Sequence, residues 1–168
     1  TVAPLYLDIF SDTICPWCFV GKARVDQALE EIPHSDDLIK VRWHPFELNP
    51  DLPVDGISRR QYRTQKFGSW ESSIQRDAMV ANAGLEDGIV FRHDLIKLTP
   101  NTRASHRLIW WAREKSQHQL VERIFQAYFH EGLDVGSVET LSKLAADCGY
   151  NQDEALQFLL SEEGVDEI

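Results

Sequence analysis

The sequence predicts an α/β fold in which a β-α-β start is followed by an inserted helical region, with an α+β domain as the alternative. Two short apolar segments with a helical pattern between them occupy residues 1–50. After about residue 58, nearly every apolar repeat has helical spacing. The chain has 168 residues, 43% of them hydrophobic, which is enough for one domain with a substantial core.

The first fifty residues are predicted to form a strand, a helix and a second strand. Leu5–Phe10 is short and apolar, as expected for a strand. Leu38–Phe46 has the same character and ends in the turn-rich sequence NPDLPVDG. Between them, Pro33 ends a helical pattern that begins at Phe19. The apolar side chains of that helix are Val25, Ala28, Leu29 and Ile32.

Residues 51–168 are predicted to be a helical domain. Two segments each place their apolar residues on one helical face: Ala104, Leu108, Trp111 and Ala112 in the first, and Val121, Ile124, Phe125 and Tyr128 in the second. The core should also contain Trp110 and Phe129. Three glycines are expected to end helices, namely Gly84, Gly132 and Gly149. Asn151 with Glu154 resembles a capping box at a helix start.

The charge and the composition exclude several classes of partner. The net charge is −10, which argues against nucleic acids and anionic membrane surfaces. No apolar stretch approaches the ~20 residues that span a bilayer, and the start of the sequence does not resemble a signal peptide. The three cysteines are an odd number, unlike a secreted disulfide scaffold. We therefore expect a cytoplasmic protein with one special cysteine pair and a buried Cys148.

The segment SDTICPWCFVGKA contains that pair, Cys15 and Cys18, at the junction of the first strand and the first helix. Cys15 should lie at the helix N-cap, where unpaired N–H groups and the helix dipole stabilise a thiolate. Pro16 suits the first helical turn, because its missing N–H would have no intrahelical partner. Cys18 is one turn further along and is placed to resolve a mixed disulfide formed at Cys15. Trp17, between them, carries no charge.

Two other interpretations of the pair are weaker. Both cysteines are small enough to be ordinary core residues, although a CxxC with an internal proline at a strand–helix junction is unusual for that role. A structural zinc site needs four ligands. No second CxxC and no HxxxH motif follows, so we expect no metal.

Taken together, several segments resemble the DsbA-like thioredoxin superfamily, specifically its FrnE branch. The likeness includes SDTICPWCFVGK, WHPFELNPDLPVDG, KFG, PNTRASHRLIWWA and FQAYFHEGLDV. It implies a thioredoxin-like fold with an inserted α-helical domain and thiol–disulfide oxidoreductase chemistry, with Cys15 attacking and Cys18 resolving. The implied partners are protein or peptide thiols and disulfides, or glutathione as a co-substrate, and the implied chemistry needs no metal or flavin.

The same branch is related to 2-hydroxychromene-2-carboxylate isomerases and kappa-class glutathione transferases. A glutathione-dependent isomerase or transferase acting on a small aromatic substrate is therefore the alternative function. Those relatives resemble this chain in fold but carry serine where Cys15 stands, so the two intact cysteines favour redox exchange. A binding module whose CxxC only senses redox state is a third, non-enzymatic interpretation.

Five further residues are candidates for tuning the thiols or contacting a substrate. Asp12 is able to relay a proton or to raise the thiol pKa by like-charge repulsion, although a solvated turn aspartate is the simpler interpretation. His44 and Glu47 flank the end of the second strand, where either is able to tune the thiols, although a structural role is the simpler interpretation. His106 and Arg107 begin a helix, capped by Asn101 or Thr102, that is able to face the cleft between the domains, although packing is the simpler role.

The resemblance also implies a β-β-α segment after the inserted helices, beginning at a cis-proline that faces the CxxC. The sequence has no proline beyond Pro100 and stops at SEEGVDEI. We therefore expect these 168 residues to be part of a longer protein, or a chain whose homo-oligomer supplies the missing strands. Without them, the sheet would have an exposed edge.

Overall fold

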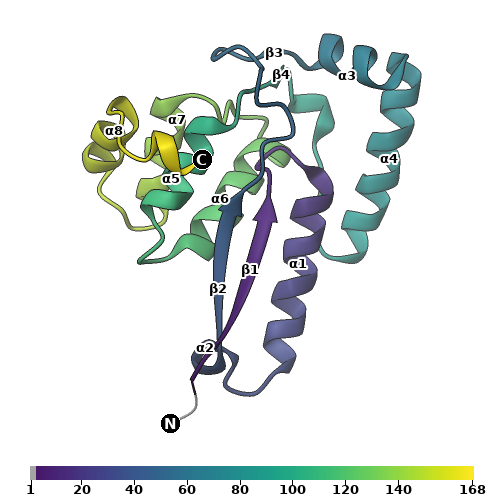
Figure 1. The fold of residues 1–168 in the computed structure, drawn as a ribbon. Helices are drawn as coiled ribbons and strands as arrows, with labels where there is room; N and C mark the ends of the chain where they lie inside the picture. Colours follow the sequence, from purple (N-terminus) through teal and green to yellow (C-terminus); the bar gives the residue numbers. More distant parts are fainter. Residues whose placement is uncertain (1–2) are drawn as a thin grey trace.

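The structure is a computed structural model that describes residues 3–168. It begins with β1 (Leu5–Ser11), α1 (Pro16–Glu31), a single turn of helix α2 (Ser35–Leu38) and β2 (Ile39–Pro45). The strands β1 and β2 are parallel and pair in register along their full length. A parallel pair requires a crossover connection, and α1 supplies it along one side of the strands (Figure 1). The predicted β-α-β start is confirmed.

Helices dominate the rest of the chain. A two-residue antiparallel bridge, β3 (Ile57–Ser58) with β4 (Leu98–Thr99), was not predicted from the sequence. The six longer helices are α3 (Arg59–Phe67), α4 (Trp70–Glu86), α5 (Arg103–Trp111), α6 (Gln117–Phe129), α7 (Val138–Asp147) and α8 (Gln152–Leu160). Two 3₁₀ turns, His93–Leu95 and Val165–Glu167, complete the order. None of these described helices is long and apolar enough to cross a membrane.

The helix α6 forms the centre of the core. Leu120, Ile124 and Phe125 are fully buried in it, and α6 packs against α1, α5, α7 and β2. In Figure 1, α3 and α4 stand on the side of α1, whereas α5, α7 and α8 gather on the side of β2. The carboxyl ends of β1 and β2 and the start of α1 therefore lie between two groups of helices.

Two predictions about the helices are wrong: the buried face expected for the first helix and the helix end expected at Gly84. On α1, Ala28 and Ile32 are exposed, because only the first turns of the helix reach the helical core, where Phe19 and Val20 are buried. Gly84 does not end a helix. It lies inside α4, where the ring of Phe91 packs so closely that a Cβ would come within 2.7 Å of it.

Other helix ends follow the sequence. Asn151 accepts a hydrogen bond from the backbone N–H of Glu154 at 2.9 Å, as expected for the start of α8. Gly149 follows the last residue of α7 with a φ of +89°, a conformation that favours glycine. Gly132 also has a positive φ, +70°, and lies against the backbone of Leu95 just after α6.

Candidate active site

Cys15 is the N-cap residue of α1, as the sequence predicts. Its N–H donates to the carbonyl oxygen of Asp12, and its own carbonyl accepts from Cys18 and Phe19. Pro16 occupies the first helical position. Cys15 and Cys18 are both unbonded thiols with partial exposure, so exposure does not distinguish them. Trp17, between them, is 51% exposed.

The two thiols have opposite pKa shifts. A hydrogen bond from the Cys18 thiol, aided by the backbone amides of Cys18 and Trp17, lowers the pKa of Cys15 to about 7. The same hydrogen bond raises the pKa of Cys18 well above its ordinary value, and burial raises it further. The first turn of the helix and the second thiol together stabilise a negative charge on Cys15, so Cys15 is the more acidic thiol of the pair.

Asp12 lies beneath this turn with only 1% of its surface exposed, so the expectation of a solvated turn residue is wrong. One carboxylate oxygen accepts from the N–H of Thr13 at 2.8 Å and lies 3.0 Å from Nε2 of His106. The other accepts from the N–H of Leu48 at 2.8 Å. Asp12 therefore ties the CxxC turn to the loop after β2 and to α5, and its charge raises the pKa of both cysteines.

Further hydrogen bonds join the turn at Cys15 to the start of α5. The hydroxyls of Thr13 and Ser105 lie 2.8 Å apart, and Ser105 donates to the carbonyl of Thr102. Thr102 is the N-cap of α5, although its side chain makes no capping bond there. The start of α5 is thus held against the start of α1 by buried hydrogen bonds, which fixes His106 beside Asp12.

A pocket of about 310 Å³ opens beside Cys15, and we call it the Cys15 pocket. Cys15, Pro16 and Trp17 line one side, together with Ile14 and Leu48. The facing wall comes from α3, α4, the 3₁₀ turn His93–Leu95, β4 and α6: Arg59, Tyr62, Arg63, Lys66, Phe67, Arg76, Asp77, Met79, Val80, His93, Thr99, Tyr128 and Phe129. Its size is that of a small-molecule site.

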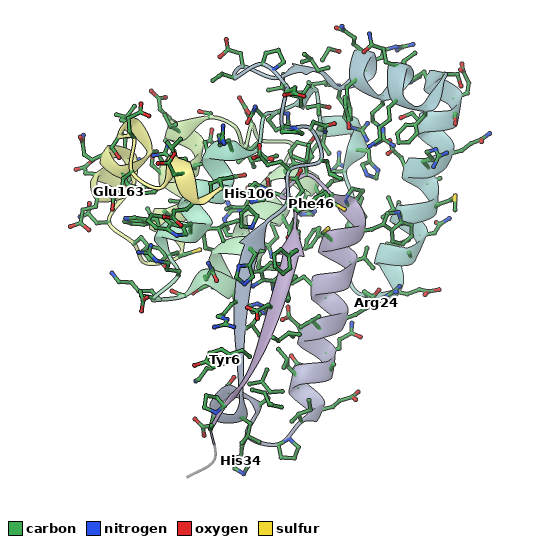
Figure 2. All side chains as sticks on the ribbon, in the orientation of Figure 1. Tyr6, Arg24, His34, Phe46, His106 and Glu163 are labelled. Carbon is green, nitrogen blue, oxygen red and sulfur yellow. The ribbon has the colours of Figure 1, made fainter. Side chains whose placement is uncertain are left out.

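The predicted candidates at the end of β2, His44 within the strand and Glu47 after it, do not line this pocket. His44 lies 2.7 Å from Asp8 and stacks on Phe10 with ring centroids 4.7 Å apart, and it lines a different pocket together with His106. Glu47 is partly exposed in the loop after β2. In Figure 2, Phe46 is labelled at the carboxyl ends of the strands, whereas Tyr6 lies toward the opposite end of the molecule.

Arg107 has the packing role that the sequence favours. Its guanidinium donates to the carbonyl oxygens of Phe158, Leu159, Ser161 and Glu163 at 2.6–3.3 Å. These bonds hold the segment after α8 against α5, and Figure 2 labels Glu163 in that segment. Arg107 is therefore committed to backbone groups rather than to a substrate.

Cys148 was expected to be buried, and it is partly exposed instead. Its sulfur lies 3.8 Å from the carbonyl oxygen of Gln119, and burial raises its pKa. Cys148 follows α7 and does not line the Cys15 pocket. Among residues 3–168, no group of three or more histidine, cysteine or acidic side chains is arranged to hold a metal ion.

Sequence reasoning missed the residues of α3 and α4 that face Cys15. Arg59, Arg63 and Lys66 belong to RRQYRTQK, which has the appearance of a solvated charged helix. Asp77 is buried and accepts from Arg59 at 2.9 Å. A signal was present in the i, i+4 spacing of the arginines, which places them on one face, but the sequence alone does not show what that face contacts.

Comparison with known proteins agrees with this geometry. The sequence profile described as the DSBA-like thioredoxin domain matches residues 6–168. The uncharacterised protein YwbO of Bacillus subtilis (strain 168) is 33% identical over 151 residues, which cover 86% of this chain and 66% of YwbO. The chain thus spans slightly less than two thirds of that relative.

Solved structures show the same fold. A probable DsbA oxidoreductase from Streptomyces coelicolor superposes with a TM-score of 0.86 at 29% identity, covering 97% of this chain and 71% of that one. The cytosolic disulfide reductase DsbM of Pseudomonas aeruginosa, solved with glutathione, gives a TM-score of 0.63 at 20% identity, covering 96% and 74%. With a thioredoxin-like α/β architecture and a profile match over almost its whole length, the chain belongs to the DSBA-like thioredoxin domain family.

Proposed function

We propose that the protein is a thiol–disulfide oxidoreductase that uses Cys15 as the attacking thiol and Cys18 as the resolving thiol. The observation that carries the proposal is the position of Cys15 at the N-cap of α1, one helical turn before Cys18 and beside a pocket. The pKa values of the two thiols shift in opposite directions there. A pKa of about 7 for Cys15 makes roughly half of the molecules nucleophilic near neutral pH, whereas a free thiol of pKa ~8.5 is mostly protonated there. Membership of the family supports the same chemistry.

The reaction begins when the Cys15 thiolate attacks one sulfur of a disulfide substrate. A Cys15–substrate disulfide forms, the substrate S–S bond breaks, and the departing thiolate takes up a proton from water. The negative charge on Cys15 has then disappeared. The hydrogen bond to Cys15 is the largest cause of the raised pKa of Cys18, followed by burial and by the charge on Cys15, so the Cys18 thiol loses its proton more easily in the mixed disulfide than in the free enzyme.

The Cys18 thiolate next attacks the sulfur of Cys15. This step forms the Cys15–Cys18 disulfide and releases the second substrate thiolate, which is protonated in turn. The enzyme has lost two electrons and the substrate disulfide has gained two, so neither a metal nor a flavin is required. Running in reverse, the same steps oxidise a dithiol substrate. We propose the cytoplasm as the compartment and protein, peptide or small-molecule thiols as the partners.

A redox titration combined with an exchange assay tests this function. The reduced protein should reduce insulin or a small disulfide, and its Cys15–Cys18 pair should titrate as a single two-electron couple against glutathione buffers. Cys15→Ser should abolish exchange, and Cys18→Ser should trap a mixed disulfide at Cys15. Cys148→Ser is the matched control and should change neither result. Exchange that persists in Cys15→Ser would refute the role of Cys15.

A glutathione-dependent reaction on a small substrate is the second candidate. It is favoured by the size of the Cys15 pocket, about 310 Å³, and by its aromatic lining. A structural neighbour was solved with glutathione, and glutathione is also a thiol partner that the proposed redox cycle would accept. Glutathione affinity measured on Cys15→Ser distinguishes the two: tight binding together with turnover of an aromatic substrate would favour the second candidate.

A further inference from the structure

The Cys15 pocket is positively charged in a chain whose net charge is −10. Four cationic side chains line it, and one carboxylate, Asp77, accompanies them. Among the described residues that line the pocket, no other acidic side chain is present. The remaining negative charge at this site is the thiolate of Cys15, which forms only when the enzyme is reduced. The four cations are Arg59, Arg63, Lys66 and Arg76.

The deeper part of the wall holds two arginines around a single carboxylate. Nη2 of Arg59 lies 2.9 Å from both oxygens of Asp77, and Nη2 of Arg63 lies 2.9 Å from one of them. The side chains of Arg59 and Arg63 are 7% and 14% exposed. Burying a charge without a full counter-charge is costly, so this cluster has the capacity to accept one more anion.

Two buried polar atoms at the same place lack a partner. Among the buried side-chain nitrogen and oxygen atoms of residues 3–168, Nε2 of His93 and Nδ2 of Asn49 make no hydrogen bond. His93 lines the Cys15 pocket, and its Nε2 is 3.9 Å from Asp77, beyond hydrogen-bond distance. Asn49 accepts a hydrogen bond from the hydroxyl of Tyr62, another lining residue. Buried groups of this kind normally have partners.

At the rim of the pocket, cationic side chains lie over the aromatic ring of Phe67. The guanidinium carbon of Arg76 lies 4.4 Å from the ring centroid of Phe67, and that of Arg63 lies 4.7 Å from it. Lys66 and Arg76 are exposed and make no ion pair among the described residues, whereas most other arginines of the chain do. Lys66 donates a hydrogen bond to the hydroxyl of Tyr62 at 3.2 Å, so an incoming anion would not have to displace a carboxylate from either side chain.

We infer that the Cys15 pocket selects a small anionic disulfide or thiol. Its carboxylate is held by the four cations of α3 and α4 (Arg59, Arg63, Lys66 and Arg76), which we call the basic wall, while its sulfur contacts Cys15. The inference rests on the proposed function and names its substrate class. A volume of about 310 Å³ suits a small molecule rather than a folded protein. The basic wall offsets the repulsion that an anionic substrate would meet from the Cys15 thiolate and from the acidic surface of the protein.

The reaction is a complete exchange. The Cys15 thiolate attacks one sulfur of the anionic disulfide, the S–S bond breaks and one carboxylate-bearing thiolate leaves. Cys18 then attacks Cys15 and releases the second. Because Cys15 reacts as a thiolate, the Cys18 thiol supplies one of the protons that end on the two product thiols and water supplies the other. The two electrons end on the product sulfurs. No other oxidant or reductant takes part.

Three small disulfides of similar size test the inference: dithiodipropionate (anionic), hydroxyethyl disulfide (neutral) and cystamine (cationic). The rate at which each oxidises the reduced protein is divided by its rate with free thioglycerol, a neutral thiol that differs from all three product thiols, which corrects for intrinsic reactivity. We expect the normalised rate to be highest for dithiodipropionate and lowest for cystamine. The preference should weaken as salt is added, because the rim charges are screened.

A matched pair of double variants tests whether the preference for the anionic disulfide arises at the pocket rim. Lys66→Gln/Arg76→Gln removes two exposed charges from the pocket rim, and Lys143→Gln/Arg113→Gln removes two exposed charges elsewhere. The first should lower the ratio of anionic to cationic rates by about threefold to tenfold, as expected for two exposed charges. The second should change it by less than about twofold, although the net charge of the two variants is the same.

The outcomes separate the inference from the proposed function. Equal normalised rates for all three probes, or equal effects of the two double variants, would overturn the inference and leave the oxidoreductase function standing. No reaction with any probe, or reaction that survives Cys15→Ser, would overturn the function and the inference together. A preference for dithiodipropionate that depends on Lys66 and Arg76 supports both.

Discussion

The carboxylate of Asp12 and the imidazole of His106 lie 3.0 Å apart in the interior, although 94 residues separate them in the sequence. Both side chains are almost fully buried, with 1% and 3% exposed. Asp12 begins the turn that carries Cys15, and His106 belongs to α5, so the contact joins the redox turn to the helical region. A charged carboxylate held directly below a thiolate opposes formation of that thiolate.

The first prediction concerns Asp12. Asp12→Asn removes a charge that raises the pKa of Cys15, so that pKa should fall below about 7. The thiolate absorbance of the reduced protein measures it directly. The variant should also lose about 1–3 kcal/mol of stability, because the buried carboxylate accepts hydrogen bonds from two backbone amides and faces His106. Asp8→Asn, on the exposed face of β1, is the control for the pKa, and an unchanged pKa in Asp12→Asn would contradict the argument.

The second prediction concerns the two thiols. The alkylation rate of the reduced protein should titrate near pH 7, the pKa of Cys15, and the fast phase should vanish in Cys15→Ser. In Cys18→Ala the fast phase should remain, but its pKa should rise, because the Cys18 thiol provides the largest lowering effect. Rapid alkylation at Cys18 together with an inert Cys15 would reverse the assigned roles.

The third prediction concerns Trp17, which is exposed between the cysteines. A positive charge at this position would stabilise the Cys15 thiolate and hence the reduced form, which makes the pair a stronger oxidant. Trp17→His should therefore raise the reduction potential by about 10–30 mV. Trp17→Gln, which is neutral, controls for loss of the indole. Equal potentials for the two variants would show that charge at this position is unimportant.

The fourth prediction concerns pH-dependent stability. Burial lowers the pKa of His93 from 6.5 to about 4, and the arginines Arg59 and Arg63 contribute, whereas Asp77 and Asp94 oppose the shift. The unfolded chain therefore binds a proton between pH 6.5 and 4 that the folded protein does not bind. The free energy of unfolding should be unaffected by His93 above this interval and should fall as the pH decreases through it.

Urea unfolding of His93→Gln checks that prediction. Glutamine does not titrate, so the decline of stability over this interval should be shallower in the variant than in the original protein. His34→Asn removes a histidine from the exposed surface and retains a residue suited to the positive φ of 59° found there, so the original slope should persist. Identical slopes in His93→Gln and the original protein would show that His93 is accessible to protons when folded.

The fifth prediction compares two helical glycines. A Cβ at Gly84 would lie 2.7 Å from the ring of Phe91, whereas a Cβ at Gly21 would have nothing within 4 Å. Gly84→Ala should destabilise the protein by about 1–3 kcal/mol, since the ring is held between Phe19 and Phe129. Gly21→Ala should stabilise it by up to about 1 kcal/mol through helix propensity. Thermal unfolding of both variants measures the contrast, and changes of the same sign would contradict it.

The β-α-β start, the α/β architecture and the N-cap position of Cys15 were predictable because local patterns determine them. Strand spacing, helical spacing and the Pro16 position all act over a few residues. The buried state of Asp12 was not predictable, because it depends on Leu48 and His106, which are distant in sequence. The exposed positions on α1 were missed for the same reason: an apolar residue is buried only where another element covers it.

The basic wall was missed for a different physical reason. Arginines on an amphipathic helix usually face water, and nothing local distinguishes Arg63 of α3 from such a residue. Its burial depends on Asp77 in α4, with which it forms an ion pair across the α3–α4 hairpin. Long-range ion pairs of this kind leave almost no trace in a single sequence.

The turn at Cys15 and the α3–α4 hairpin, which both line the Cys15 pocket, lie more than forty residues apart in the chain. Under the proposed function, the turn sets the reduction potential of the thiol pair and the hairpin contacts the substrate. Mutations in the hairpin are therefore able to change the molecule that is accepted without altering the potential of the couple. Under this division, we expect related proteins to differ in substrate through residues 59–80 while the turn at Cys15 stays constant. A protein engineer who wants a different substrate would exchange that hairpin first.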